Sequence, residues 1–140
     1  MLLKDRTAVV YGGGGAVGGA VAKAFAREGA RLFLAGRTRA SLEAVAQDIQ
    51  KSGGRADVAP VDATDHEAVE AHLKDVAAAA GPVKIMFNAV GLDDTQGAPL
   101  TEMPRERFIA PIVTAMKTWF STGTANARHM AAKMTFGFPG

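Results

Sequence analysis

Cysteine is absent from this 140-residue chain, and aromatic residues are scarce at 6%. The absence of cysteine excludes disulfides, thiol nucleophiles and thiolate metal sites, and it is typical of a reducing compartment. No uninterrupted apolar run is long enough to cross a bilayer, and residues 4–6 (Lys-Asp-Arg) stand where a signal peptide would need its apolar segment. We therefore expect a soluble, cytoplasmic protein with no membrane partner.

Neither sign of charge dominates the chain. Sixteen Lys and Arg residues face 14 Asp and Glu residues, for a net charge of +2, and the two signs are interspersed. No basic block is present that would predict a nucleic-acid partner. With 48% hydrophobic residues, the length and composition predict one globular domain over residues 1–140.

The hydrophobic pattern alternates between strands and helices, which predicts a parallel α/β sheet. A long helix is expected from Pro104 to about Lys133, with Pro111 kinking or dividing it. Residues 134–140 are poor strand sequence and are predicted to be an irregular tail. The four expected strands cover residues 7–11, 31–35, 56–61 and 83–87.

Helix starts and buried faces follow from the same pattern. Ser41 is predicted to cap the second helix, and Thr64 with Glu67 three residues later forms a capping box for the third. Apolar spacing predicts that the second helix buries Leu42, Val45, Ala46 and Ile49. It predicts that the first helix buries Val17, Ala20, Val21, Ala24 and Phe25.

Four consecutive glycines, residues 12–15, connect the first strand to the first helix. Such a loop brings bare backbone N–H groups to a diphosphate at the N-terminus of a helix. Gly13, Gly15 and Gly18 satisfy the pattern G-x-G-x-x-G in the strand–turn–helix context that the motif requires. The alternative is a glycine turn with a purely structural role.

Three later segments stand at strand ends: residues 34–38 (Leu-Ala-Gly-Arg-Thr), 62–65 (Asp-Ala-Thr-Asp) and 88–91 (Asn-Ala-Val-Gly). With the glycine loop, they make residues 5–133 resemble the short-chain dehydrogenase/reductase family. The resemblance implies a Rossmann-type, doubly wound parallel sheet that is incomplete, with about four strands and flanking helices before the long helix. In the family register Thr-Gly-x-x-x-Gly-x-Gly, Gly12 and Gly18 match the pattern, whereas Tyr11 and Ala16 depart from it.

The resemblance also implies a nucleotide site at the strand ends. Asp62 would lie at the adenine ring and Asn88 near the nicotinamide-side ribose. Asp62 has an alternative role as the anion at a helix N-terminus, where Asp65 is the better cap. Asn88 could also cap the fourth strand structurally, a role that is compatible with the ribose contact. The residues expected to bind the cofactor are Gly12, Gly14, Gly15, Ala16, Val17, Arg37, Asp62, Ala63, Asn88 and Ala89.

The end of the second strand indicates which nucleotide is preferred. An NAD site places a carboxylate there for the ribose 2′-OH, but this chain has Gly36 followed by Arg37. A guanidinium binds a 2′-phosphate bidentately, so Arg37 favours NADP(H) over NAD(H). The alternative is a solvated surface arginine beside Arg39. The same two residues disfavour a methyltransferase, which usually needs an acidic residue at this position.

No catalytic residue is predicted in this chain. The family's reaction uses a Ser and a Tyr followed four residues later by a Lys, whereas the one tyrosine here, Tyr11, is followed by Gly15. No asparagine occurs at residues 112–115, where the family has one in its proton relay, and Asn126 lies too far along. His66 and His72 are six residues apart on a helix, do not converge on a metal, and are predicted at the surface or its boundary.

These patterns leave two hypotheses for function. The first is the NADP(H)-binding portion of a short-chain oxidoreductase, which in full-length form moves hydride between nicotinamide and a small alcohol or carbonyl. The chain alone is then expected to be inactive, and its ending is interpreted as that of a truncated or frame-shifted family member. The second is a non-catalytic NADP(H)-binding module or an inactive fragment. By resemblance, a homo-oligomer is expected through the helix over residues 104–133.

Overall fold

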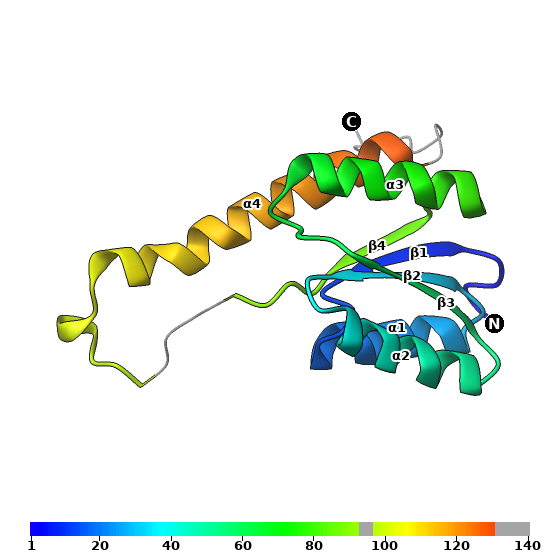
Figure 1. Ribbon diagram of the computed structural model, residues 1–140, viewed down its shortest axis with the longest axis horizontal. Helices are drawn as coiled ribbons and strands as arrows, with labels where there is room; N and C mark the ends of the chain where they lie inside the picture. The colour runs from blue at the N-terminus through cyan, green and yellow to red at the C-terminus, as the bar shows by residue number, and fades with distance from the viewer. Residues whose placement is uncertain (93–96, 131–140) are drawn as a thin grey trace, which may run out of the picture.

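The computed structural model describes residues 1–92 and 97–130 and contains one parallel sheet with the strand order β3-β2-β1-β4. The strands are β1 (Thr7–Tyr11), β2 (Arg31–Gly36), β3 (Arg55–Pro60) and β4 (Ile85–Asn88). The helices are α1 (Ala16–Arg27), α2 (Arg39–Lys51), α3 (His66–Ala80) and α4 (Arg105–His129), with a short 3-10 turn, η1 (Leu100–Glu102). Figure 1 shows α1 and α2 on one face of the sheet and α3 and α4 on the other. The predicted doubly wound architecture is confirmed.

Strand β1 lies in the middle of the sheet and is buried along its whole length. Its side chains alternate between the two faces. Ala8 and Val10 join the core under α1 and α2, whereas Val9 and Tyr11 join the core under α3 and α4. Tyr11 is paired with Ala35 of β2 on one side and with Asn88 of β4 on the other. The end of β1 is therefore held from both sides.

The buried face predicted for α1 is only partly correct, since Phe25 packs against the core and Val21 and Ala24 are half-buried, but Val17 and Ala20 are exposed. Gly18, Gly19 and Ala22 are buried, whereas Val17 is 65% exposed. The helix lies so close to the glycine loop that a Cβ at Gly18 would collide with the carbonyl oxygen of Gly12. Close approach selects small residues for the face next to the loop, and Val17 is left exposed to the solvent.

Helix α2 buries the four predicted residues, Leu42, Val45, Ala46 and Ile49. Its cap differs from the prediction, since the helix begins at Arg39 after Thr38, and Ser41 lies in the first turn. The Ser41 hydroxyl donates to the Thr38 carbonyl oxygen at 2.9 Å.

The predicted capping box of α3 is also wrong. Asp65 is the N-cap, and its carboxylate accepts a hydrogen bond from the Ala68 amide at 3.1 Å. Thr64 instead directs its hydroxyl to Asp62, at 2.7 Å. A carboxylate at the N-cap also stabilises the positive end of the helix dipole, which explains why Asp65 takes the position.

Helix α4 runs without interruption through Pro111, so the predicted division does not occur. Residues 105–110 are exposed, and the turn before the proline ring is free to adjust. The helix ends at His129, because Met130 forms a parallel β-bridge with Val83. Lys133 and the predicted tail over residues 134–140 lie outside the described residues. Among the helices described, none has the length and apolar character needed to cross a membrane.

Candidate nucleotide-binding site

A cavity of about 520 Å³ opens where the four parallel strands end. Segments that follow each strand line it: the glycine loop after β1, residues 36–38 after β2, residues 61–64 after β3 and residues 89–91 after β4. Parallel α/β sheets bind ligands at this edge. The cavity is lined by nine of the predicted cofactor-binding residues: Gly12, Gly14, Gly15, Ala16, Val17, Arg37, Asp62, Ala63 and Ala89.

The structure favours one of the two glycine registers. Gly12 has a φ of +70°, and an added Cβ would collide with the carbonyl oxygen of Ala89. Within the loop and first helix, Gly12 and Gly18 are the positions where an added Cβ would collide with backbone atoms, as the register Gly12–Ala16–Gly18 requires. Ala16 is exposed on the cavity wall at the start of α1, so the departure there adds one methyl group to open space.

The N-terminus of α1 lies on the cavity wall, where residues without large side chains leave the backbone accessible. Its N-cap, Gly15, is in an extended conformation and has no side chain that could cap the helix. The first turn of α1 contains no acidic residue. The first-turn N–H groups and the positive end of the helix dipole therefore lie together on this wall, as an anion-binding site requires.

At the ends of β2 and β3, the cavity carries one positive and one negative side chain. Arg37 is exposed, and Asp62 accepts hydrogen bonds on Oδ1 from the amide and hydroxyl of Thr64, at 2.9 and 2.7 Å. These bonds from Thr64 lower the pKa of Asp62, with a smaller contribution from the nearby Arg37 guanidinium. Asp62 is thus held as a carboxylate and in a fixed orientation at the cavity edge.

Asn88 is the one predicted site residue outside the cavity lining. Its Nδ2 donates to the Thr122 hydroxyl at 3.1 Å, and its Oδ1 accepts from the Val90 amide at 3.0 Å. Both ends of the side-chain amide are engaged within the protein, as the structural alternative for Asn88 predicts. Its contact with a ribose stays a prediction.

Comparison with known proteins identifies the family. The family model described as short chain dehydrogenase matches residues 6–137. The chain belongs to this family. Gluconate 5-dehydrogenase of Gluconobacter oxydans (strain 621H) is 33% identical over 128 residues, which cover 91% of this chain and 49% of that protein.

Solved structures of short-chain dehydrogenases share the fold. A dehydrogenase/reductase from Sinorhizobium meliloti 1021 has 32% identity and a TM-score of 0.82, covering 92% of this chain and 51% of that one. A metagenomic short-chain oxidoreductase in complex with NADP has 29% identity and a TM-score of 0.77, covering 92% and 58%. The chain thus spans about half the length of the relatives it matches.

Tyr11, the other departure from the family's glycine pattern, points away from the cavity. Its side chain is fully buried between β1 and α4, where Asn126 Nδ2 donates to the hydroxyl oxygen at 2.9 Å. Burial raises the pKa of Tyr11 to about 12, and the hydrogen bond from Asn126 only partly opposes this rise. The phenol therefore keeps its proton near pH 7, and Tyr11 is not among the residues that line the cavity.

Several residues that line the cavity were missed from the sequence. Thr38 and Ser41 lie beside Arg37 because the β2–α2 connection is short, a signal that the helix start could have supplied. Thr114 reaches the cavity from α4, 25 residues beyond Ala89, and depends on the tertiary placement of that helix. No local pattern in the sequence predicts that placement. The further lining residues are Ala35, Gly36, Leu42, Val61, Thr64, Val90 and Gly91.

The three histidines lie on the α3–α4 side of the sheet, away from the cavity lining. His66 is exposed, as predicted, but His72 is only 8% exposed and its Nδ1 has no partner among the described residues. Burial lowers the pKa of His72, so the imidazole is neutral. His129 Nε2 lies 2.8 Å from Oε2 of Glu70. Within residues 1–92 and 97–130, no three His, Asp or Glu side chains gather in a metal-binding arrangement.

Proposed function

We propose that the chain is the NADP(H)-binding portion of a short-chain oxidoreductase. The observation that carries this proposal is the cavity at the strand ends, where the N-terminus of α1 and Arg37 both present positive charge. The absence of a side chain at Gly12 and Gly18 fits a ligand that approaches the backbone closely. The family binds NAD(P), and a solved relative holds NADP.

The preference for NADP(H) rests on the end of β2. Gly36 leaves no carboxylate that would repel a 2′-phosphate, and Arg37 supplies a guanidinium to bind it. Thr38 and Ser41 line the same part of the cavity, and the Thr38 hydroxyl is suited to donate to a phosphate oxygen, whereas the Ser41 hydroxyl already donates to the Thr38 carbonyl oxygen.

We assign the remaining cavity residues by their position. The backbone of the loop from Gly12 to Val17 would hold the diphosphate, and Asp62 with Ala63 would contact the adenine. Ala89 would lie on the nicotinamide side, with Asn88 behind it. A bound nicotinamide would supply hydride transfer to or from a small alcohol or carbonyl, which is the activity we propose for the whole protein.

A second candidate is a module that binds NADP(H) without catalysis. It is favoured by Tyr11, because the chain's one tyrosine is buried, neutral and turned away from the cavity. In either case, the chain's own residues bind and orient the nucleotide.

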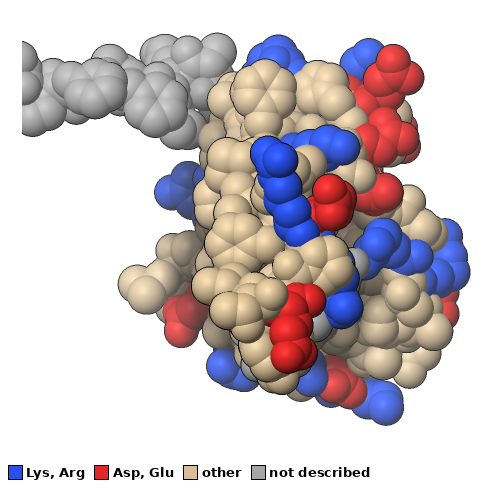
Figure 2. Space-filling view, turned by 90° about the vertical axis from the view of Figure 1, so that its left-hand side faces the viewer, with Lys and Arg blue, Asp and Glu red and all other residues tan. Residues whose placement is uncertain are grey.

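We further propose that the protein forms homo-oligomers through α4. The helix exposes large apolar side chains at heptad-like spacing. Figure 2 views the molecule from the end where α4 begins, and much of that face is uncharged. The exposed apolar residues are Phe108, Ile109, Ile112, Val113, Met116, Trp119 and Phe120.

Replacing Arg37 tests the proposed cofactor preference. NADPH and NADH would be titrated by their fluorescence against the wild-type chain and the Arg37→Ala variant. Loss of the guanidinium should weaken NADPH binding about tenfold or more, because a charge-assisted bidentate contact is lost, and change NADH binding about twofold at most.

Arg39→Ala is the matched control for this experiment. Arg39 lies two residues further along and pairs with Glu43 on α2, at 3.6 Å. The control should bind both nucleotides as the wild type does. Equal losses of NADPH and NADH binding in Arg37→Ala would contradict the assignment of Arg37 to the 2′-phosphate.

A further inference from the structure

Helix α4 holds the ends of β1 and of the neighbouring edge strand β4 through side chains spaced one helical turn apart. Asn126 Nδ2 donates to the Tyr11 hydroxyl at 2.9 Å and to the Thr122 carbonyl oxygen at 2.8 Å. Thr122, four residues earlier, accepts from Asn88 Nδ2 at 3.1 Å. Tyr11 and Asn88 are register partners on β1 and β4, so α4 contacts both strands at the same level.

Each of these strand residues directly precedes a wall of the cavity. Tyr11 is followed by Gly12, and Asn88 is followed by Ala89. The two walls touch, because a Cβ at Gly12 would collide with the Ala89 carbonyl oxygen. The Ala89 amide also donates to the Tyr11 carbonyl oxygen at 2.8 Å. A small shift of Tyr11 or Asn88 therefore moves a wall of the cavity.

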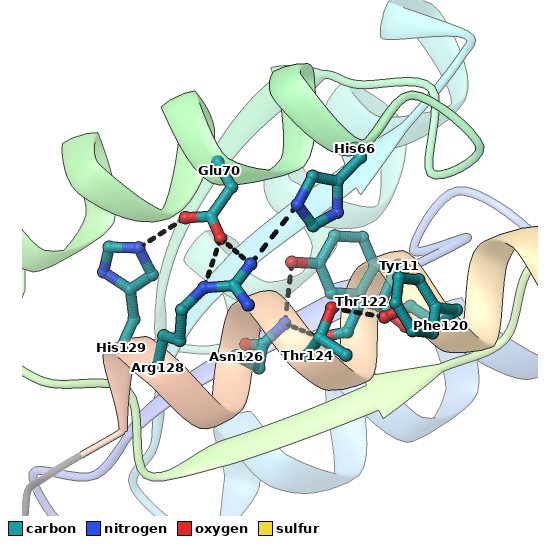
Figure 3. A network of polar contacts seen from close by, with 9 residues as sticks. All are labelled: Tyr11, His66, Glu70, Phe120, Thr122, Thr124, Asn126, Arg128 and His129. Carbon is teal, nitrogen blue, oxygen red and sulfur yellow. Dashed lines mark hydrogen bonds and ion pairs between the residues drawn. The ribbon is translucent and has the colours of Figure 1, made fainter.

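The hydrogen bond between Tyr11 and Asn126 is buried and specific. Tyr11 is fully buried and Asn126 is 1% exposed, and 115 residues separate them in the chain. Figure 3 shows Asn126 reaching from α4 to the phenol beneath α3. Water does not compete for this bond, so removing the hydroxyl leaves a buried amide with one acceptor fewer.

We propose that Tyr11 and Asn126 are positioning residues for the dinucleotide, an inference that rests on the proposed NADP(H) site. Their hydrogen bond fixes α4 against the end of β1 and thereby sets the spacing between Gly12 and Ala89. That spacing determines the fit of the diphosphate and nicotinamide half of the ligand. The adenosine half, at Arg37 and Asp62, would lie at the ends of β2 and β3, away from the contact between Gly12 and Ala89.

The experiment compares wild type with Tyr11→Phe and Asn126→Leu, and uses Thr124→Ala as the control. Thr124 also lies on α4, but its hydroxyl donates to the Phe120 carbonyl oxygen of the same helix at 2.6 Å. The affinities for NADPH and for adenosine 2′-monophosphate are measured for each chain. NADPH binding should weaken about fivefold in both test variants, whereas binding of the adenosine fragment stays unchanged.

A second readout needs no ligand. Amide exchange at Ala89 and Val90, whose N–H groups donate to Tyr11 and Asn88, should accelerate in the test variants but not in Thr124→Ala. Exchange at Gly54, which donates to Ile49 at the far end of α2, should stay constant and report intact global folding.

The outcomes separate this inference from the proposed function. A purely structural pair would weaken both ligands together and accelerate exchange at Gly54 as well, which would overturn the proposal. Unchanged NADPH affinity in Tyr11→Phe would also overturn it. If the wild-type chain binds neither ligand, the proposed function fails, and local acceleration at Ala89 and Val90 still supports the coupling while its absence contradicts it.

Discussion

His72 is the buried titratable side chain of α3, and its protonation couples folding to pH. The ring lies in the core with Nδ1 unpartnered, and burial lowers its pKa, opposed weakly by the nearby Asp75. The unfolded chain therefore binds a proton at higher pH than the folded chain does. The stabilisation is present above the unfolded value of 6.5 and is lost as the pH falls through the folded value.

We predict that the free energy of unfolding decreases more steeply below pH 6.5 in the wild type than in His72→Gln. Urea denaturation at a series of pH values measures this slope. His66→Gln is the control, because His66 is exposed on the same helix, and it should retain the wild-type slope. Parallel curves for wild type and His72→Gln would contradict the account of this histidine.

The positions of individual residues in the structure differ in how well the sequence alone predicts them. Gly12 and Arg37 were predicted because a strand, a turn and a helix start define their positions within a few residues. The partner of Tyr11 was not, because Asn126 lies 115 residues away and nothing local marks it as buried. His72 was predicted at the surface or its boundary but is buried, because its burial depends on tertiary packing around α3 that the local sequence does not show.

At the scale of elements, the α3–α4 contact is closed by a polar cluster at the end of α4. Glu70 of α3 accepts from Arg128 Nε at 2.8 Å and lies 2.8 Å from His129 Nε2 (Figure 3). The hydrogen bond from Arg128, and secondly that from His129, lower the pKa of Glu70. This cluster therefore ties the C-terminal turn of α4 to α3 while Glu70 is ionised.

We predict that Glu70→Gln destabilises the chain by about 1 kcal/mol or less, because the Arg128 side chain is half exposed and solvent screens the pair. Thermal unfolding at neutral pH measures the loss. Arg128→Met should cost a similar amount, and the double variant should lose less than the sum of the two. Strict additivity would show that the two side chains are not coupled.

The helices differ in how well periodicity predicts their buried faces. Helix α2 packs by the bulk of its apolar residues, so spacing alone identified Leu42, Val45, Ala46 and Ile49. Helix α1 instead packs with its backbone close to the glycine loop. Gly18 and Gly19 therefore occupy the buried face that apolar spacing had assigned to Val17 and Val21. A hydrophobic pattern assigns large apolar residues to the buried face. It therefore misses a close backbone contact that only glycine allows.

At the scale of the whole molecule, the described chain leaves one large apolar surface on α4. Trp119 and Phe120 are more than half exposed, and Ile112 and Met116 continue the stripe toward the start of the helix. In Figure 1 the first part of α4 extends beyond the sheet. A second copy packed along the stripe would remove it from water.

We predict that the wild-type chain sediments as an oligomer and that the double variant Ile112→Glu, Met116→Glu sediments as a monomer. Two charges on the stripe would have to be buried at the interface, which is unfavourable. Sedimentation velocity at several concentrations measures the change. Lys117→Glu, which changes the charge of an exposed position on the same helix, is the control and should leave the wild-type association intact.

The overall fold was predictable because its determinants are repeated along the chain. Strands β1, β2 and β3 are each followed by a short connection into a helix, so errors of one or two residues at a cap leave the topology unchanged. The cavity followed, since the ends of parallel strands meet at one edge. The contribution of α4 to the cavity, through Thr114, and to the strand ends was not predictable, because it depends on how the long helix lies over the sheet.

The central claim is that the cavity at the strand ends holds NADP(H). A titration of the isotope-labelled chain with NADP, followed through its backbone amide signals, tests the claim most directly. We predict shifts at residues 12–17, 37–38, 61–64 and 89–91. The cleft of about 420 Å³ between α1 and α2, lined by Lys23, Arg27 and Lys51, should be unaffected. Unchanged signals throughout, or shifts confined to that basic cleft, would contradict the account.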